Sequence, residues 1–447
     1  MSCALGKGLS NLNPAFVSEK DRWERVDIED IPFMVSDEGA IVCIPKEFEV
    51  FALGICGMSG NGKSLCLNHL VTELFHHQKN NVCILNDVQE ETYKWSEPMD
   101  DYQFNKSNEE TLNQKPVASP IVYVYQNTNT LKLNTNYLES ERKNYLKTVL
   151  PFNEIIEDIG FYLAGVNPEF ELGKSETYLM NLQEDLIGCD TSHQVREILE
   201  ENLPGGDGKT FQSMRVKIFT AFENLFKEEI LNITNPECHS YLRIRLPTGT
   251  KNSAPDYVSN PFSVLMKAGI IPSFVTSDLA NKKYKSAIFS YYINSIFHNN
   301  LEDFPGEKTF MVFDELRDVC ENDTEPAAKA MGQVGAKGRM NNVGLVYCTQ
   351  FYDRIPKCVK GAKLNYLFAF THNSSDIITE IGKDFDLDRK TRDKLKHLRK
   401  FEIIAMTSNH FVCYRDGEKW TETRPLKGKI LFPLSGHSVA GKGGKTI

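Results

Sequence analysis

Short apolar runs alternate with longer amphipathic segments along most of the chain. An apolar run at 51–56 is followed by a glycine-rich turn and then by apolar residues at helical spacing as far as Phe75. Further strand-like runs lie at 39–45, 82–85, 121–125, 271–276, 309–313 and 343–348. Strands that alternate with helices are typical of an α/β fold, so we predict a mainly parallel central sheet.

The pattern changes in the middle of the chain. Between 136 and 262 strand signals become sparse, and charged segments with helical periodicity replace them, most clearly at 211–230. We therefore predict a largely helical insertion that divides the α/β core. The predicted segments are a lead-in at 1–45, core parts at 46–135 and 263–425, the insertion at 136–262, and a flexible tail at 426–447, which ends rich in Gly, Lys and Ser.

Composition narrows the classes of protein further. The 447 residues carry 51 Lys and Arg against 60 Asp and Glu, a net charge of −9. This charge excludes binding of nucleic acid by bulk attraction, although it permits a local basic groove. No apolar run reaches the roughly 18–20 residues of a membrane span, and the N-terminus lacks a hydrophobic signal core. The 11 cysteines are scattered, so we expect reduced thiols and a cytoplasmic protein.

Residues 57–64 fit the pattern G-x-x-x-x-G-K-[ST], between a predicted strand and a predicted helix. Glycines let backbone N–H groups converge on a phosphate, and the start of the helix adds its positive dipole end. We expect Lys63 at the β- and γ-phosphates and the Ser64 hydroxyl at Mg²⁺. ATP and Mg²⁺ are the predicted ligands, and the predicted binding residues are Gly57, Gly60, Asn61, Gly62, Lys63, Ser64 and Leu65.

Two carboxylates follow the apolar strand at 309–313. Asp314 is expected to hold the Mg²⁺ water shell, and Glu315 to act as general base toward the attacking water. The next strand ends at Gln350, which is expected to sense the γ-phosphate or orient the water. Arg339 is either an arginine finger for a neighbouring subunit or a surface arginine. The predicted catalytic residues are Lys63, Glu315, Arg339 and Gln350.

Together these segments resemble the HerA/FtsK superfamily of ring-forming, DNA-pumping ATPases. The phosphate loop is generic, whereas the spacing from Arg339 to Gln350 is more specific. The resemblance spans about residues 45–415. It implies a RecA-like ASCE P-loop core, ATP hydrolysis, a ring that is expected to be a hexamer, and duplex DNA as the moved substrate.

The chain departs from the superfamily in three places. The lead-in is too short for the β-barrel of HerA, the membrane segments of FtsK and conjugation coupling proteins are missing, and Phe351-Tyr352 replaces the familiar Arg-Pro. The chain therefore looks like a reduced member. Viral genome packaging is one role implied by analogy, in host cytoplasm or virion, with a nuclease, portal or capsid partner.

Seven of the twelve residues at 389–400 are basic, and only Asp393 opposes them. This segment, predicted to be helical, either contacts nucleic-acid phosphates or is a solvated helix face. Two alternative functions stay open. One is a protein assembly or export ATPase, and the other is an ATP-gated partner-binding protein with little turnover. DNA-stimulated hydrolysis separates them from a DNA translocase.

Overall fold

A computed structural model provides the coordinates of the chain. It describes most of the predicted α/β core and short pieces of the predicted insertion. The described residues are 28–87, 91–98, 117–126, 145–148, 150–152, 183–187, 189, 191–202, 216, 219–220, 222–224, 226–227, 231–232, 242–244, 256–258, 261–276, 279, 282–361 and 364–436. The insertion therefore lies mostly outside the described residues.

Among the described residues, half of the strands that form the main sheet match the apolar runs that the sequence analysis predicted as strands. These are β2 (Ile41–Ile44), β3 (Ala52–Cys56), β4 (Asn81–Asp87), β5 (Ile121–Gln126), β11 (Ile271–Val275), β12 (Thr309–Phe313) and β13 (Val343–Thr349). The other half are β1 (Ile31–Ser36), β6 (Tyr145–Thr148), β14 (Tyr366–Ala369), β15 (Glu402–Thr407), β16 (Phe411–Arg415), β17 (Glu418–Glu422) and β18 (Leu426–Ile430). Two small separate sheets pair β7 (Leu150–Pro151) with β8 (Leu231–Asn232) and β9 (Leu242–Ile244) with β10 (Asp256–Val258).

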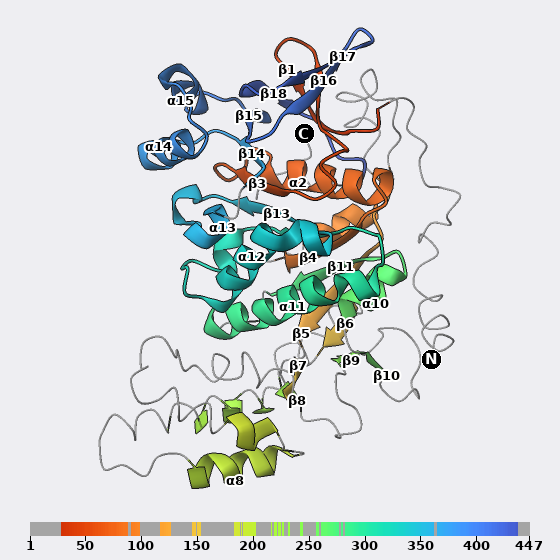
Figure 1. Ribbon diagram of the computed structural model, residues 1–447, viewed down its shortest axis with the longest axis vertical. Coiled ribbons are helices and arrows are strands. Elements are labelled where there is room, and N and C mark those ends of the chain that lie inside the picture. Colours follow the sequence, from red (N-terminus) through yellow and green to blue (C-terminus); the bar gives the residue numbers. More distant parts are fainter. Residues whose placement is uncertain are drawn as a thin grey trace.

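These strands form a mixed sheet that is 14 strands wide in the described part of the chain (Figure 1). Its order is β17-β16-β2-β1-β18-β15-β14-β3-β13-β12-β4-β11-β5-β6. From β14 to β6 neighbouring strands are parallel, whereas from β17 to β15 they are antiparallel. The parallel sheet was predicted. Most of its antiparallel extension was not, because its strands come from both ends of the chain.

Helices cover both faces of the parallel part. They are α2 (Lys63–Thr72) with the π-helix η2 (Glu73–His77), α10 (Pro261–Lys267), α11 (Lys282–Asp303), α12 (Pro326–Lys337), α13 (Lys357–Gly361), α14 (Ser375–Asp384) and α15 (Arg389–Leu395). Shorter helices are η3 (Glu91–Ser96), η5 (Leu316–Asp318), η6 (Gly338–Asn341) and η7 (Tyr352–Arg354), and α8 (Ser192–Asn202) lies in the predicted insertion.

Two apolar layers form the core, one on each face of the sheet. Successive residues of a strand point to opposite faces. In β3, Leu53 and Ile55 accordingly pack with α2, whereas Ala52 and Cys56 pack with α11 and α12. All five residues of β3 and of β12, and all seven of β13, are buried. The loops that follow these three parallel strands therefore emerge at one edge of a rigid sheet.

Helix α2 is enclosed on all sides, although the sequence pattern predicted one apolar face. Residues 65–72 are all buried. The chain end covers the outer side, where the Asn68 side chain donates hydrogen bonds to the carbonyls of Ser435 (3.3 Å) and Gly436 (3.1 Å). Residues 426–436, which we assigned to the flexible tail, thus form β18 and part of the packing around α2.

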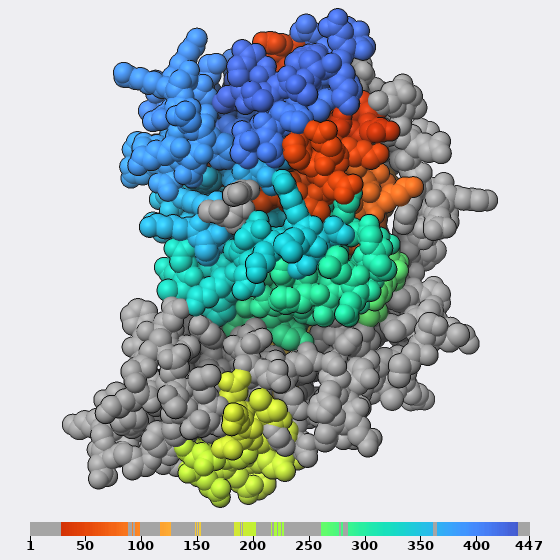
Figure 2. Space-filling view, in the orientation of Figure 1, coloured from red at the N-terminus to blue at the C-terminus, as the bar shows by residue number. Residues whose placement is uncertain are grey.

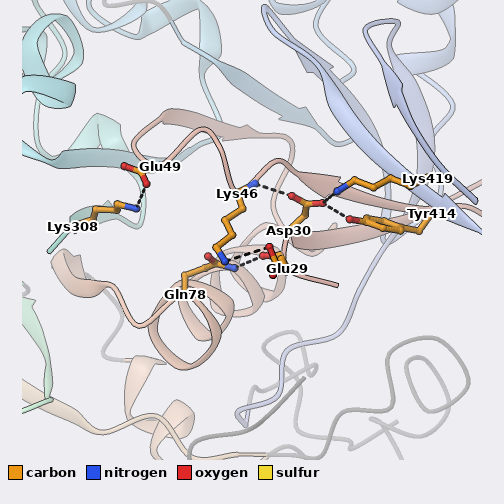
Figure 3. Close-up of polar contacts among 8 residues, drawn as sticks. All are labelled: Glu29, Asp30, Lys46, Glu49, Gln78, Lys308, Tyr414 and Lys419. Atoms are coloured by element: carbon orange, nitrogen blue, oxygen red, sulfur yellow. Dashed lines mark hydrogen bonds and ion pairs between the residues drawn. The ribbon is translucent and has the colours of Figure 1, made fainter. Parts of the chain in front are cut away.

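A polar cluster fastens the antiparallel end of the sheet (Figure 3). Asp30, which is 5% exposed, accepts hydrogen bonds from the Lys46 N–H (2.8 Å) and the Tyr414 hydroxyl, and forms an ion pair with Lys419 (3.1 Å). Burial alone would raise the pKa of the Asp30 carboxyl, but these three partners hold it below its usual value. The cluster joins the start of β1 to the β16–β17 hairpin.

None of the described helices combines the length and the apolar composition that a membrane span requires. The nine cysteines within the described ranges are all free, and eight of them are buried.

Candidate nucleotide and hydrolysis site

The predicted phosphate loop lies between the end of β3 and the start of α2. Gly60 and Gly62 have φ values of +81° and +110°, which L side chains rarely adopt. A Cβ on Gly62 would lie 2.7 Å from the ring of Phe401, and one on Gly57 would lie 2.5 Å from the Cβ of Phe370. Gly57 also has a positive φ, of +156°, so the loop needs glycine at 57 and 62 for both reasons and at 60 because of its φ alone.

The start of α2 offers unpaired donors. Hydrogen bonding within the helix begins at Cys66, whose N–H bonds to the carbonyl of Gly62 (2.9 Å). The N–H groups of Lys63, Ser64 and Leu65 precede this bond, so they lack helical partners and carry the positive end of the dipole. The side chain of Leu65 is buried in the core, which leaves only its N–H for a phosphate.

Side chains of the loop converge on one carbonyl. Lys63 Nζ donates to the Met58 carbonyl (3.1 Å), as does Asn61 Nδ2 (3.3 Å). An ammonium group and an amide therefore lie against the loop itself. A phosphate is the ligand that such a positive, glycine-rich loop favours.

Two neighbouring segments hold the loop from outside. The N–H of Met58 donates to the carbonyl of Thr371, which follows β14 (3.2 Å), and the N–H of Phe401 donates to the carbonyl of Asn61 (3.1 Å). Sequence reasoning missed both contacts. They join residues more than 300 positions apart, and no local pattern indicates that the strands that bring them together are neighbours.

The two predicted carboxylates follow β12 and are held by β4. Asn86, at the end of β4, donates its side-chain N–H groups to the carbonyls of Asp314 (2.9 Å) and Glu315 (3.1 Å). Thr276, after β11, donates to the Asn86 side-chain oxygen (2.8 Å). Asn86 is thus a positioning residue that the sequence analysis did not single out as one.

Glu315 lies against the end of β13. Its Oε1 accepts hydrogen bonds from the Thr349 hydroxyl (3.3 Å) and the Gln350 N–H (3.4 Å). Burial raises the pKa of the Glu315 carboxyl, and the Gln350 N–H and the charge of Lys63 oppose this shift. The structure therefore brings Lys63, Glu315 and Gln350 together at one edge of the sheet.

Ser64 and Asp314 fit the predicted metal site in chemistry. Both supply the hard oxygen ligands that Mg²⁺ prefers. Within the described part of the chain, the Ser64 hydroxyl makes no hydrogen bond. Burial raises the pKa of the Cys348 thiol beneath the site, and Asp314 and Lys63 both act on this thiol with opposite effects. Asp314 directly follows β12, whose neighbour β13 pairs with β3, the strand that leads into the phosphate loop.

Arg339 does not join this group. It is exposed, and it lies on η6 just before β13 begins, whereas Gln350 follows the end of the same strand. The seven residues of β13 separate these two ends by about 20 Å. Arg339 therefore cannot reach the nucleotide of its own chain in this arrangement.

Comparisons with known proteins find relatives by structure. No protein-family model matches the chain, and no curated protein matches it. The solved structure of VirB4 from Thermoanaerobacter pseudethanolicus matches at 14% identity over 91% of this chain and 98% of that one, with a TM-score of 0.50. The plasmid coupling protein TrwB, solved with the ATP analogue ADPNP, matches at 12% identity over 94% of each chain, with a TM-score of 0.52.

The chain has the fold of VirB4 and TrwB. At the level of the fold, this likeness agrees with the resemblance that the sequence showed. The genome-packaging NTPase B204 of Sulfolobus turreted icosahedral virus 2 also matches, at 13% identity over 34% of this chain and 66% of that one. The TM-score of this match is 0.25.

Proposed function

We propose that the chain is a RecA-like ASCE ATPase that assembles into a hexameric ring and moves duplex DNA. One observation carries the ATPase proposal: Lys63 of the phosphate loop, Glu315 and Gln350 meet at one edge of a buried parallel sheet. The fold shared with TrwB, which was solved with a non-hydrolysable ATP analogue, supports ATP as the ligand.

Each residue has a defined task in this proposal. The N–H groups at the start of α2 and Lys63 bind and orient the β- and γ-phosphates. Glu315 accepts a proton from the attacking water, and its raised pKa brings it nearer the working range of a general base. Gln350 orients that water and responds when the γ-phosphate leaves. Ser64 and Asp314 would hold Mg²⁺, which would supply positive charge to neutralise the phosphates.

Arg339 has its task on another subunit. Because it lies at the opposite edge of its own sheet, we propose that it stabilises charge on the nucleotide of the adjacent subunit in the ring. This proposal requires a head-to-tail contact between the two edges. An unpaired surface arginine is the alternative.

Duplex DNA as the moved substrate rests on the superfamily resemblance. A DNA motor of this kind suits viral genome packaging with a portal or capsid partner, or DNA processing with a nuclease. The site chemistry is the same in each role, because only partners outside the ATPase core differ.

Steady-state ATP hydrolysis with and without long duplex DNA tests the proposal. We expect several-fold stimulation at low salt, which weakens as salt rises because phosphate contacts are screened. The control is Lys63→Ala, which should abolish both rates. Turnover that ignores DNA would overturn the translocase and favour a protein assembly or export ATPase. Tight ATP binding with negligible turnover would favour an ATP-gated binding protein.

A further inference from the structure

Helices α14 and α15 follow β14 and precede β15 in the chain. Hydrogen bonds through Thr371 link them to the phosphate loop. The Thr371 carbonyl accepts from the N–H of Met58 in the loop (3.2 Å), and its hydroxyl donates to the carbonyl of Lys396, just past α15 (3.3 Å). The next N–H, that of His372, donates to the Leu395 carbonyl (3.1 Å). Thr371 thus links the C-terminal end of α15 to the phosphate loop by hydrogen bonds.

A second connection runs to the end of β13. Tyr352, which is buried, lies two residues after Gln350 and donates its hydroxyl to Asp384 at the end of α14 (2.8 Å). Lys360 lies over the Tyr352 ring (4.7 Å) and forms an ion pair with Glu380 of α14 (2.8 Å). The same helical unit is therefore tied to the strand end that holds Glu315.

The two helices are also fastened to each other. The Arg392 guanidinium of α15 donates to the carbonyls of Leu387 (2.8 Å) and Gly382 of α14 (3.2 Å). The Asp388 side chain caps α15 by accepting from the Thr391 N–H (2.6 Å). We expect α14 and α15 to move as one body, because these bonds join one helix to the start of the next.

The segment 389–400 of this unit is rich in exposed cations, whereas Asp376, Asp384, Asp386 and Asp388 are exposed carboxylates elsewhere in the unit. Asp393, the one acidic residue at 389–400, pairs with Lys396 (3.7 Å), and Arg392 is occupied as described above. Figure 2 shows the unit as a light-blue lobe at the upper left of the molecule. The cations that remain are exposed and make no ion pair within the described part of the chain, and we call them the α15 surface: Arg389, Lys390, Lys394, Arg399 and Lys400.

We infer that the α15 surface contacts the phosphate backbone of duplex DNA and that the bound nucleotide sets its position through Thr371 and Tyr352. Charge complementarity identifies the partner, because five unpaired cations on a chain of net charge −9 fit a regular polyanion. The phosphate loop contacts the nucleotide, and the end of β13 responds to its γ-phosphate. Because α14 and α15 are hydrogen-bonded to the phosphate loop and to the end of β13, a movement of these two segments relative to each other would shift the two helices. This inference rests on the proposed function.

Replacement of two surface cations tests the contact. In Lys390→Gln/Lys394→Gln, duplex binding followed by fluorescence anisotropy should weaken, and the slope of log affinity against log salt should fall by about 2. The matched control is Lys79→Gln/Lys429→Gln, which removes two exposed, unpaired lysines from outside the α15 surface. The control should keep the wild-type slope.

The outcomes separate the inference from the proposed function. Wild-type protein that fails to bind duplex DNA overturns the proposed function, and the inference with it. Wild-type binding together with an unchanged slope in the α15 variant overturns the inference alone. A variant that loses ring assembly, measured by light scattering, but keeps the slope also overturns it, because the surface is then a subunit interface.

Removal of one hydroxyl tests the coupling. We expect wild-type affinity for duplex DNA to differ between a non-hydrolysable ATP analogue and ADP. Tyr352→Phe, which loses only the bond to Asp384, should move the ratio of these affinities toward 1. The control Tyr414→Phe loses a hydroxyl bonded to Asp30 at the antiparallel end (Figure 3) and should keep the ratio. A wild-type ratio in Tyr352→Phe, or a wild-type ratio of 1, overturns the coupling.

Discussion

Glu315 has a backbone conformation that its partners must maintain. Its φ is +69°, and a non-glycine residue held there costs of order 1–3 kcal/mol. The Asn86 side chain offsets this cost by donating hydrogen bonds to the carbonyls of Asp314 and Glu315, which flank the Cα of Glu315. The Glu315 carboxylate therefore points at the end of β13, where it accepts a hydrogen bond from the Gln350 N–H.

Glu315→Gln should bind ATP with nearly wild-type affinity and hydrolyse it about 10²–10⁴ times more slowly, because glutamine cannot accept a proton. Equilibrium binding of a fluorescent ATP analogue and single-turnover hydrolysis measure the two effects separately. The control is Glu418→Gln, an exposed glutamate on β17. A near-normal hydrolysis rate would remove Glu315 from the role of general base.

Asp30→Asn should lower the free energy of unfolding by about 1.5–3 kcal/mol at neutral pH, because hydrogen bonds to a charged group are lost. The folded-state pKa lies below the usual value of 3.8. The contribution is therefore complete above pH 3.8 and is lost as pH falls through the folded-state pKa. Urea unfolding at neutral pH and below pH 3.8 measures the difference, which should shrink in acid. Equal differences at both would contradict this account.

At the scale of elements, the phosphate loop is shaped by strands on either side of it. The helix after the loop is predictable from its apolar residues, but the close approach of Phe401 to Gly62 is not. That approach exists because β15 starts at the edge where β14 ends. The loop is thus positioned by the sheet order as much as by its own glycines.

Gly62→Ala should weaken ATP binding more than Gly60→Ala. Both positions have positive φ, so both variants carry similar backbone strain, but only the Gly62 variant also meets a ring, at 2.7 Å. The added Cβ at Gly60 has nothing within 4 Å. Titration with a fluorescent ATP analogue, with thermal unfolding as a check on folding, measures the difference. Equal losses would show that strain alone decides.

At the scale of the whole molecule, the sheet separates the candidate residues into two edges. Lys63, Glu315 and Gln350 share one edge, and Arg339 lies at the other. In the proposed function, a single chain therefore lacks Arg339 at its own site, and an adjacent chain would supply it. This separation motivates the ring in the proposed function.

A mixture of Lys63→Ala and Arg339→Ala chains should recover part of the ATPase activity that each has lost. An interface between an intact phosphate loop and an intact Arg339 forms only in mixed rings. The control mixes Lys63→Ala with Glu315→Gln, which share one site and should give no recovery. Absence of recovery in rings shown by mass spectrometry to be mixed would count against Arg339 acting on its neighbour.

The sequence by itself determined the elements that depend on local pattern. Strands β3, β12 and β13 are buried along their whole length, so their sequences must be short apolar runs that can be recognised locally. The phosphate loop is also a local pattern, because its glycines lie within a few residues of Lys63. Asp314 and Glu315 follow a buried strand, so their place at the edge of the sheet was predictable. The sequence identified Arg339 as a candidate residue, but it did not indicate that Arg339 lies at the opposite edge of the sheet from the phosphate loop.

Only the tertiary structure decided which distant segments meet. Asn86 under Glu315, Thr371 and Phe401 against the phosphate loop, and the chain end over α2 all depend on strand order. Strand order follows from packing across the whole sheet, and a local pattern of apolar residues specifies which face is buried but not which strand lies beside it. For the same reason, α15 was a basic segment in the sequence and became a neighbour of the nucleotide site in the fold.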